Sequence, residues 1–132
     1  MWIMTTFGFF SVVEKPWDRE RGTLTVRARV KGDLLALKAK YLPELGPIKR
    51  SDTADYRFRA QAPRSAVAQA MRRVVHDLDY DNFKDAVATR HSHERAAKYG
   101  EVWGILYDLQ METTPARGRR PRRRHTSSRI SR

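Results

Sequence analysis

Arginine side chains alternate with apolar ones in two separate segments of this chain. Arg27 and Arg29 alternate with valine and alanine, and Arg57 and Arg59 alternate with aromatic residues and alanine in a later segment. Residues two positions apart on a β-strand share a face, so the four arginines are predicted to project from one side of a sheet. Guanidinium groups bind phosphates, and sheets that combine them with aromatic rings bind single-stranded RNA or DNA.

The surroundings of these arginines leave two interpretations open. The first apolar segment would place aromatic rings beside them, from among Phe7, Phe9 and Phe10. The chain carries no sequence that resembles the aromatic submotifs of RNA-recognition modules. In the alternative interpretation the arginines are ordinary outward-facing residues that pair with a carboxylate of Glu14, Asp18 or Glu20.

The last twenty residues, 113–132, hold eight arginines and no acidic side chain. They supply +8 of the formal net charge of +12, and the remaining 112 residues are only mildly basic. A polycation associates with nucleic acids because it releases their condensed counterions. Proline, glycine and serine separate the arginines, so we expect a disordered tail that buries no core. We interpret the tail as a nucleic-acid arm. The alternatives are a contact to an acidic protein partner or a solvated extension. The proposed nucleic-acid contacts of the tail are Arg117, Arg119, Arg120, Arg122, Arg123 and Arg124.

Four aspartates crowd one stretch of the chain and invite a metal-binding interpretation: Asp77, Asp79, Asp81 and Asp85. An EF-hand loop that began at Asp77 would need glycine where Asn82 stands and glutamate where Ala88 stands. Capping of helix N-termini explains Asp81 and Asp85 without a metal. A metal-dependent hydrolase remains an alternative function, since such enzymes also cluster carboxylates.

Other residue types that carry catalysis are scattered. His76, His91 and His93 do not by themselves make a metal site, and the chain has no cysteine to complete one. We find no phosphate-binding glycine loop, nucleophile elbow or Ser-His-Asp arrangement. We therefore predict no catalytic residue, no metal site and no cofactor.

A polar-aromatic group near the end of the patterned region is a candidate partner-binding surface. It comprises Tyr80, Phe83 and Lys84 together with Trp103. We expect Trp103 to close the core against the sheet; if it lies outside, it becomes an anchor for a protein partner. The corresponding alternative function is a protein-interaction module, such as a phage or host inhibitor.

Two kinds of periodicity predict the elements that position these residues. Period-two segments indicate strands, and apolar residues at helical spacing indicate helices. The stretches 16–22 and 47–53 are polar and are predicted as turn and loop. The predicted strands are 2–13, 24–30 and 56–60, and the predicted helices are 33–42, 63–78, 81–87 and 92–110.

This order of elements predicts an α+β fold. Short connections favour an antiparallel sheet of three strands with helices packed on one face, in a ferredoxin-like arrangement or a truncated variant of it. A four-stranded sheet would need the first strand to break at Gly8. We expect one domain over residues 1–112, followed by the tail 113–132.

The composition also bounds the setting of the protein. The absence of cysteine fits a reducing compartment. The apolar N-terminal stretch is shorter than the roughly 20 residues that cross a bilayer, and it lacks the basic lead of a signal peptide. We therefore expect a cytoplasmic protein without a membrane partner.

Four segments together resemble a family of small uncharacterised bacterial and phage-borne proteins. They are MWIMTTFGFFSVV at 1–13, VRAR at 26–29, DYDNFK at 79–84 and YGEVW at 99–103. The resemblance covers residues 1 to about 110 and excludes the tail. It implies a coherent domain in a cytoplasmic setting, and it brings no known activity and no catalytic residue.

The leading hypothesis from the arginine face and the basic tail is a non-enzymatic protein that binds RNA or single-stranded DNA without sequence specificity.

Overall fold

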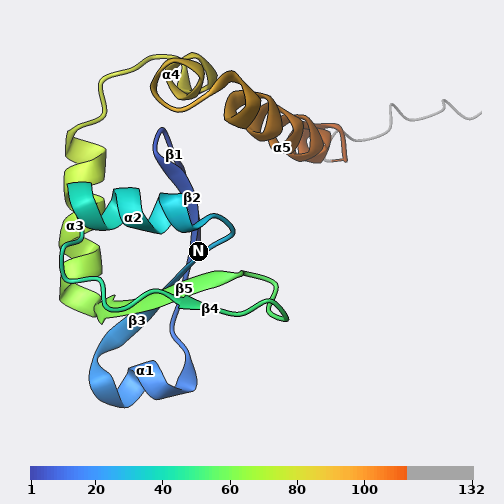
Figure 1. Cartoon of the computed structure of the whole chain (residues 1–132). Coiled ribbons are helices and arrows are strands. Elements are labelled where there is room, and N and C mark those ends of the chain that lie inside the picture. Colours follow the sequence, from blue (N-terminus) through green and yellow to red (C-terminus); the bar gives the residue numbers. More distant parts are fainter. Residues whose placement is uncertain (113–132) are drawn as a thin grey trace, which may run out of the picture. The chain divides into compact units, whose positions relative to one another are not determined.

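The computed structural model describes residues 1–112, and within them it has an α+β fold with an antiparallel sheet, which confirms the predicted fold class (Figure 1). The strands are β1 (Trp2–Thr5), β2 (Gly8–Val13), β3 (Thr23–Ala28), β4 (Lys49–Arg50) and β5 (Phe58–Pro63). The helices are α1 (Pro16–Arg21), α2 (Lys31–Lys40), α3 (Arg64–His76), α4 (Phe83–Arg90) and α5 (His93–Glu112).

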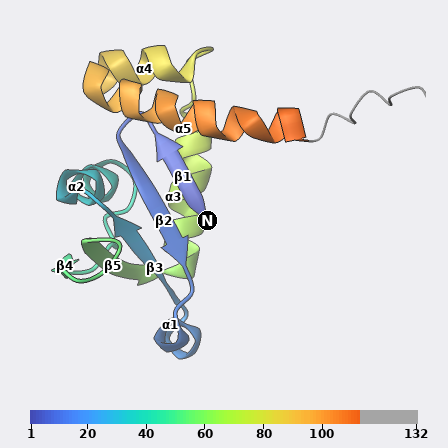
Figure 2. The ribbon, with the colours of Figure 1, turned by 90° about the vertical axis from the view of Figure 1, so that its right-hand side faces the viewer.

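The sheet has five strands in the order β1-β2-β3-β5-β4, and every neighbouring pair is antiparallel (Figure 2). It therefore has more strands than the three or four expected. The predicted first strand folds into a hairpin because Thr5 organises a tight turn. The Thr5 hydroxyl donates to the Gly8 carbonyl at 2.9 Å, and Thr5 Oγ1 accepts the amides of Phe7 and Gly8 at 3.2 and 3.0 Å. The additional edge strand, β4, lies in a segment predicted as loop.

Helix α1 occupies the stretch predicted as a polar turn. Pro16 stands in its first turn, where a missing amide hydrogen costs nothing. Asp18 accepts the Lys15 amide at 2.8 Å and the hydroxyls of Thr23 and Thr25 at 2.6 and 2.8 Å. Gly22 ends the helix with φ of 64°, a left-handed conformation that glycine adopts without strain.

The main core lies between one face of the sheet and the helices α2 and α3. Apolar residues at alternate positions of the strands point into it, as period two requires. Helix residues fill the space at helical spacing, and the whole cluster excludes solvent. Its members are Phe10, Val12, Val26, Ala28, Leu34, Leu37, Leu42, Leu45, Ala60, Ala62, Val67 and Ala70.

A second, smaller cluster lies on the other face of the β1-β2 hairpin. Met4 and Phe9 are register partners there, and they pack against Val87, Ala96 and Tyr99 of α4 and α5. Helices therefore contact both faces of the sheet at this end. The sequence pattern did not indicate the second contact, because Met4 and Phe9 were assigned to one long strand.

The chain divides into two compact units, residues 1–100 and the residues from Glu101 onward. Helix α5 runs through the boundary and supplies the described part of the second unit, residues 101–112. Among the described residues, no helix is long and apolar enough to span a membrane.

Candidate functional site

A row of five side chains crosses the whole sheet on one face. The strand registers pair Trp2 with Ser11, Ser11 with Arg27, Arg27 with Arg59, and Arg59 with Lys49. Directly opposed residues of antiparallel strands project to the same side. We call this set the cross-strand row: Trp2, Ser11, Arg27, Arg59 and Lys49.

The cross-strand row lies on the face opposite to the main core. Val26 and Ala60 are buried in that core, so their neighbours Arg27 and Arg59 project from the other side. Trp2 is 67% exposed at one edge of the sheet and meets Phe9 edge to face, with ring centroids 5.7 Å apart. Lys49 is exposed at the other edge. The row thus combines an aromatic surface with three cations.

Arg27 and Arg59 occupy the centre of the row, and no carboxylate of the described residues neutralises them. Arg27 donates from Nη2 to the Ser11 hydroxyl at 2.8 Å, and Arg59 donates from Nη2 to the Tyr56 carbonyl at 3.4 Å. Neither guanidinium has a carboxylate within 4.0 Å among residues 1–112. Two like charges therefore stand side by side on neighbouring strands.

Tyr56 gathers the arginines of this face. The guanidinium carbons of Arg27 and Arg29 lie 4.5 and 4.4 Å from its ring centroid, within the range of a cation-π contact. Arg29 also donates to the Asp55 carbonyl at 2.7 Å. Tyr56 is only 3% exposed, and its uncharged aromatic ring thus holds two cations close together through cation-π contacts, not through an ion pair.

Three buried donors in this group have no hydrogen-bond partner among residues 1–112. They are the Tyr56 hydroxyl, Arg27 Nε and Arg59 Nε. A buried donor without an acceptor costs about 1–3 kcal/mol, so native proteins rarely leave one unsatisfied. The concentration of three at one place marks this part of the row as the least internally satisfied group of the described chain.

The four arginines singled out in the sequence do not behave alike. Arg27 and Arg59 are strand residues that share the predicted face. Arg29 follows the end of β3 and joins Arg27 at Tyr56. Arg57 precedes β5, and its Nε lies 3.6 Å from an Asp52 oxygen that also binds Arg50 at 2.8 Å. Within residues 1–112, Arg27, Arg29 and Arg59 therefore have no carboxylate partner, whereas Arg57 has one.

Two of the three carboxylates suggested as neutralising partners are engaged elsewhere. Glu14 forms ion pairs with Arg19 and Arg64. Asp18 is fully buried, and its oxygens accept from threonines and from a backbone amide. The described geometry thus gives no support to pairing of these two with Arg27, Arg29 or Arg59. The tail arginines Arg117, Arg119, Arg120, Arg122, Arg123 and Arg124 lie outside the described residues.

The polar-aromatic group is partly structural. Phe83 stacks on Tyr99 with centroids 5.7 Å apart and contacts the second cluster, and Tyr80 lies 5.9 Å from Phe83. Lys84 lies beside Gly100 of α5. Because these side chains pack on one another, they join α4 to the start of α5.

The expectation that Trp103 closes the core is wrong. Its side chain is 64% exposed and stacks on Tyr107, with ring centroids 5.3 Å apart. The exposed large apolar residues of the described part of the second unit are Trp103, Ile105, Leu106, Tyr107, Leu109 and Met111. The hypothesis of a protein-interaction surface stays a prediction.

The aspartates between α3 and α4 serve separate structural roles. Asp79 pairs with Arg90 at 2.7 Å, and this hydrogen bond lowers the pKa of Asp79. Asp77 accepts the Tyr41 hydroxyl at 2.9 Å. Asn82, not Asp81 as predicted, caps α4 by accepting the Asp85 amide at 3.0 Å. Within residues 1–112, no three His, Asp or Glu side chains come together as a metal-binding group.

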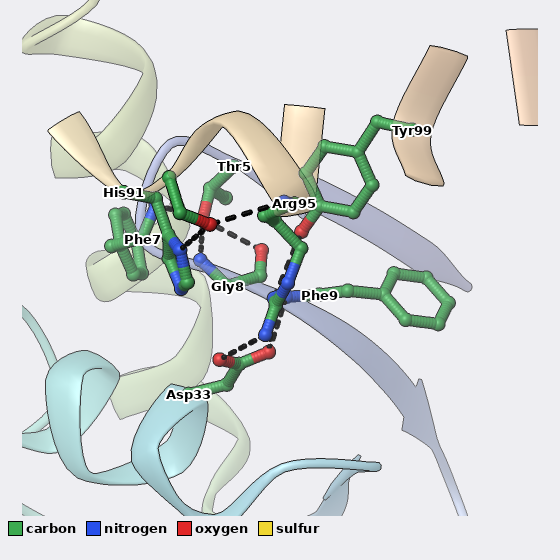
Figure 3. Close-up of polar contacts among 9 residues, drawn as sticks. Thr5, Phe7, Gly8, Phe9, Asp33, His91, Arg95 and Tyr99 are labelled. Atoms are coloured by element: carbon green, nitrogen blue, oxygen red, sulfur yellow. Dashed lines mark hydrogen bonds and ion pairs between the residues drawn. The ribbon is translucent and has the colours of Figure 1, made fainter. Parts of the chain in front are cut away.

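A buried ion pair ties the hairpin, α2 and α5 together (Figure 3). The Arg95 guanidinium donates to Asp33 from Nη1 at 2.8 Å and from Nη2 at 3.2 Å, and the Phe9 amide donates to Asp33 Oδ2 at 3.0 Å. The hydrogen bonds that Arg95 donates to Asp33 raise the pKa of Arg95 above its usual range. Burial raises the pKa of Tyr99, although the Arg95 hydrogen bond to its hydroxyl opposes the shift. Both Asp33 oxygens accept hydrogen bonds, and within residues 1–112 no buried side-chain nitrogen or oxygen of Asp33, Arg95 or Tyr99 lacks a partner. We therefore assign the group a structural role.

Sequence reasoning missed four residues of the site: Trp2, Ser11, Lys49 and Tyr56. The register of the β1-β2 hairpin brings Trp2 and Ser11 into the row, and a turn at Thr5 was the signal that would have indicated it. Lys49 belongs to a two-residue strand with no period of its own. Tyr56 was assigned to an apolar strand face, whereas it precedes β5 and lies beneath arginines.

Comparison with known proteins adds no assignment to this geometry. The chain matches no family model, no curated protein and no solved structure.

Proposed function

We propose that this protein binds single-stranded nucleic acid, RNA or single-stranded DNA, along the cross-strand row, in a cytoplasmic setting. Arg27, Arg59 and Lys49 contact phosphates, and Trp2 stacks on a base. The binding depends on backbone and stacking contacts, so it has little sequence preference.

The observation that carries this proposal is the pair of facing arginines. Arg27 and Arg59 are direct register partners, and neither has a carboxylate within 4.0 Å in the described chain. Like charges directly opposite each other destabilise a sheet. A phosphate between them removes the repulsion, so the arrangement is suited to an anionic ligand.

The dimensions of the row also fit a single strand. Neighbouring β-strands lie about 4.8 Å apart, so the row from Trp2 to Lys49 extends about 19 Å across the sheet. Trp2 then lies about 10 Å from Arg27, across two strand spacings. An unpaired strand can place a base on the indole and its phosphates on the cations, because its bases are free to stack.

The arginine-rich tail supplies a second, less specific contribution. Its eight arginines add affinity that falls steeply as the salt concentration rises. A test of the row must therefore separate it from the tail while keeping the whole chain.

The test compares two charge-matched double variants of the full-length protein. Arg27→Gln with Arg59→Gln removes two charges from the row. Lys38→Gln with Arg72→Gln removes two charges from α2 and α3, the helices on the opposite face. Binding of a short fluorescent single-stranded oligonucleotide is measured by anisotropy between 50 and 300 mM salt, concentrations on the order of those where phosphate contacts are lost.

The row variant should bind more weakly, by about 2 kcal/mol for each charged hydrogen bond lost. The slope of log affinity against log salt concentration should become less steep by about 1.4 in this variant, since each neutralised phosphate of a single strand contributes about 0.7. The control variant should keep the slope of the unmodified protein. Equal slopes and affinities in all three proteins would contradict the proposal.

A further inference from the structure

Two arginines at the centre of the cross-strand row and the adjoining Tyr56 hold three hydrogen-bond donors that lack an acceptor within residues 1–112. The Tyr56 hydroxyl, Arg27 Nε and Arg59 Nε are all buried, and none has a partner among the described residues. Arg27 lies over the Tyr56 ring, and Arg59 bonds to the Tyr56 carbonyl, so the three donors belong to one contiguous group.

These donors share one requirement. Arginine carries no acceptor, and neither arginine has a carboxylate within 4.0 Å in the described chain. The tyrosine hydroxyl donates only if an acceptor comes close to it. A ligand that satisfies the group must therefore present acceptor oxygens and negative charge to these three side chains.

We infer that Arg27, Arg59 and Tyr56 form a cradle for a phosphate monoester, so that the row prefers a strand with a terminal phosphate. The inference rests on the proposed function and names the part of the ligand that the centre of the row takes. From here on we call these three residues the oxyanion cradle.

The charge of the oxyanion cradle favours a monoester over the diester links inside a strand. Two guanidinium groups lie here with no carboxylate within 4.0 Å in the described part of the chain. A phosphate monoester carries between −1.5 and −2 at pH 7, on the order of what two arginines neutralise, and offers three strong acceptor oxygens. A diester carries a single charge and has two free oxygens. The planar guanidinium is also the side chain best shaped for paired hydrogen bonds to phosphate.

The experiment measures a preference ratio in the full-length chain. Affinity for a 5′-phosphorylated single-stranded oligonucleotide is divided by affinity for the same oligonucleotide with a 5′-hydroxyl. Inorganic phosphate serves as a competitor, which distinguishes a site for any free phosphate from a site for the end of a strand. We expect a ratio of about ten, the factor that corresponds to 1.4 kcal/mol.

Two variants test the residues of the cradle at constant charge. Tyr56→Phe removes the hydroxyl and keeps the ring on which Arg27 and Arg29 lie. Arg59→Lys keeps the charge and removes the planar fork. Both retain the tail, so a ratio produced by the tail alone would survive them. Each should lower the ratio toward one. Tyr56→Phe should do so while affinity for the 5′-hydroxyl strand changes less than about threefold. Arg59→Lys is judged on the ratio alone, because Arg59 also contacts phosphates of the 5′-hydroxyl strand. Circular dichroism establishes that each variant is folded, and either folded variant suffices.

The outcomes separate the two proposals. Equal affinity for both oligonucleotides, with binding still dependent on Arg27 and Arg59, overturns the cradle and leaves the proposed function intact; water alone then satisfies the three donors. A ratio above one that neither folded variant changes also overturns it. Loss of the row-dependent binding altogether removes both. Inorganic phosphate is added as the competitor at about millimolar concentration, the scale of a weak single-site affinity. Displacement of only the 5′-phosphorylated strand supports a site that also accepts free phosphate.

Discussion

Arg27 and Arg59 are direct partners across β3 and β5, so the longest strand pairing of the sheet carries two facing positive charges. Sheet pairs of like charge destabilise the fold, whereas opposite charges at the same positions stabilise it. The relationship therefore predicts that stability and ligand binding respond in opposite directions to a charge change at this position.

Replacing Arg59 by glutamate tests that trade-off. Arg59→Glu creates an oppositely charged pair with Arg27, so the free energy of unfolding should rise by about 0.2–1 kcal/mol. Affinity for single strands should fall by tenfold or more, on the order of 1.4 kcal/mol. Urea denaturation and anisotropy measure the two effects. Gln61→Glu is the control. It places a carboxylate on the same strand as Arg59 but opposite the uncharged Thr25, so it should not stabilise the protein.

The indole of Trp2 should affect binding more than folding. Trp2→Ala removes a side chain that is mostly solvent-exposed, so the urea midpoint should change little. Affinity for a single strand should fall by about 1–3 kcal/mol, the contribution of one stacked base. Trp17→Ala provides the comparison, since Trp17 is also exposed but lies on α1 outside the row. Equal losses of affinity in the two variants would argue against stacking on Trp2.

The Asp33–Arg95 ion pair should dominate the free energy that holds α5 to α2 and to the β1-β2 hairpin. Arg95→Met leaves the buried Asp33 carboxylate with the Phe9 amide as its remaining donor, and breaking a buried pair in this way costs about 3–5 kcal/mol. Arg50→Met breaks an exposed pair with Asp52 and should cost less than about 1 kcal/mol. Thermal unfolding of both variants measures the difference. Adding Asp33→Asn to the Arg95 variant should recover part of the loss, because no buried charge then remains.

Asp18 should make the fold sensitive to acid. Burial alone would raise the pKa of Asp18, but hydrogen bonds from Thr23, the Lys15 amide and Thr25 together hold it below its ordinary value. A carboxyl with a lowered folded-state pKa stabilises the protein above the unfolded value of about 3.9, and this contribution disappears as the pH falls through the folded value. Urea midpoints at pH 6 and in the acid range measure it.

The matched variant for this prediction is Asp18→Asn. It should be less stable than the unmodified protein at neutral pH, and the two proteins should converge as the pH falls below roughly 3.9. A constant difference across that range would show that the charge of Asp18 does not contribute.

Two glycines should respond to alanine in opposite directions. A Cβ atom at Gly8 would lie 2.7 Å from Asp33 Cβ and 2.8 Å from Phe10 Cζ, so Gly8→Ala should destabilise by about 1–3 kcal/mol. A Cβ at Gly104 meets nothing within 4 Å among the described residues, so Gly104→Ala should favour α5 by about 1 kcal/mol. Thermal unfolding reports the first effect and helical circular dichroism the second.

Local patterning was sufficient to predict β3, β5 and most of the helices. Leu24, Val26 and Ala28 alternate with polar residues in a segment that is a strand, and the apolar spacing after Pro63 corresponds to α3. Period two also placed Arg27 and Arg59 on the face away from the core. These features depend on neighbours in the sequence, which is why they can be read from it.

Features that depend on register or on distant partners were not predictable in this way. Thr5 makes the turn that divides the first apolar segment, and only the resulting register places Trp2 opposite Ser11. Asp33 was interpreted as the start of a helix, whereas its carboxylate binds Arg95, 62 residues later in the chain. Trp103 shows that local spacing can also mislead. Helical spacing places it on the same helix face as Tyr99, yet of the two only Tyr99 is buried.

The link between Asp33 and Arg95 also orders events during synthesis. A ribosome releases the N-terminus first, so β1, β2 and α2 emerge well before residue 95 does. Until then the Asp33 carboxylate has the Phe9 amide but not the Arg95 guanidinium, and the face formed by Met4 and Phe9 lacks its α5 partners Ala96 and Tyr99. The nascent chain can therefore assemble its sheet early, yet it reaches its full resistance to unfolding only after Arg95 has emerged.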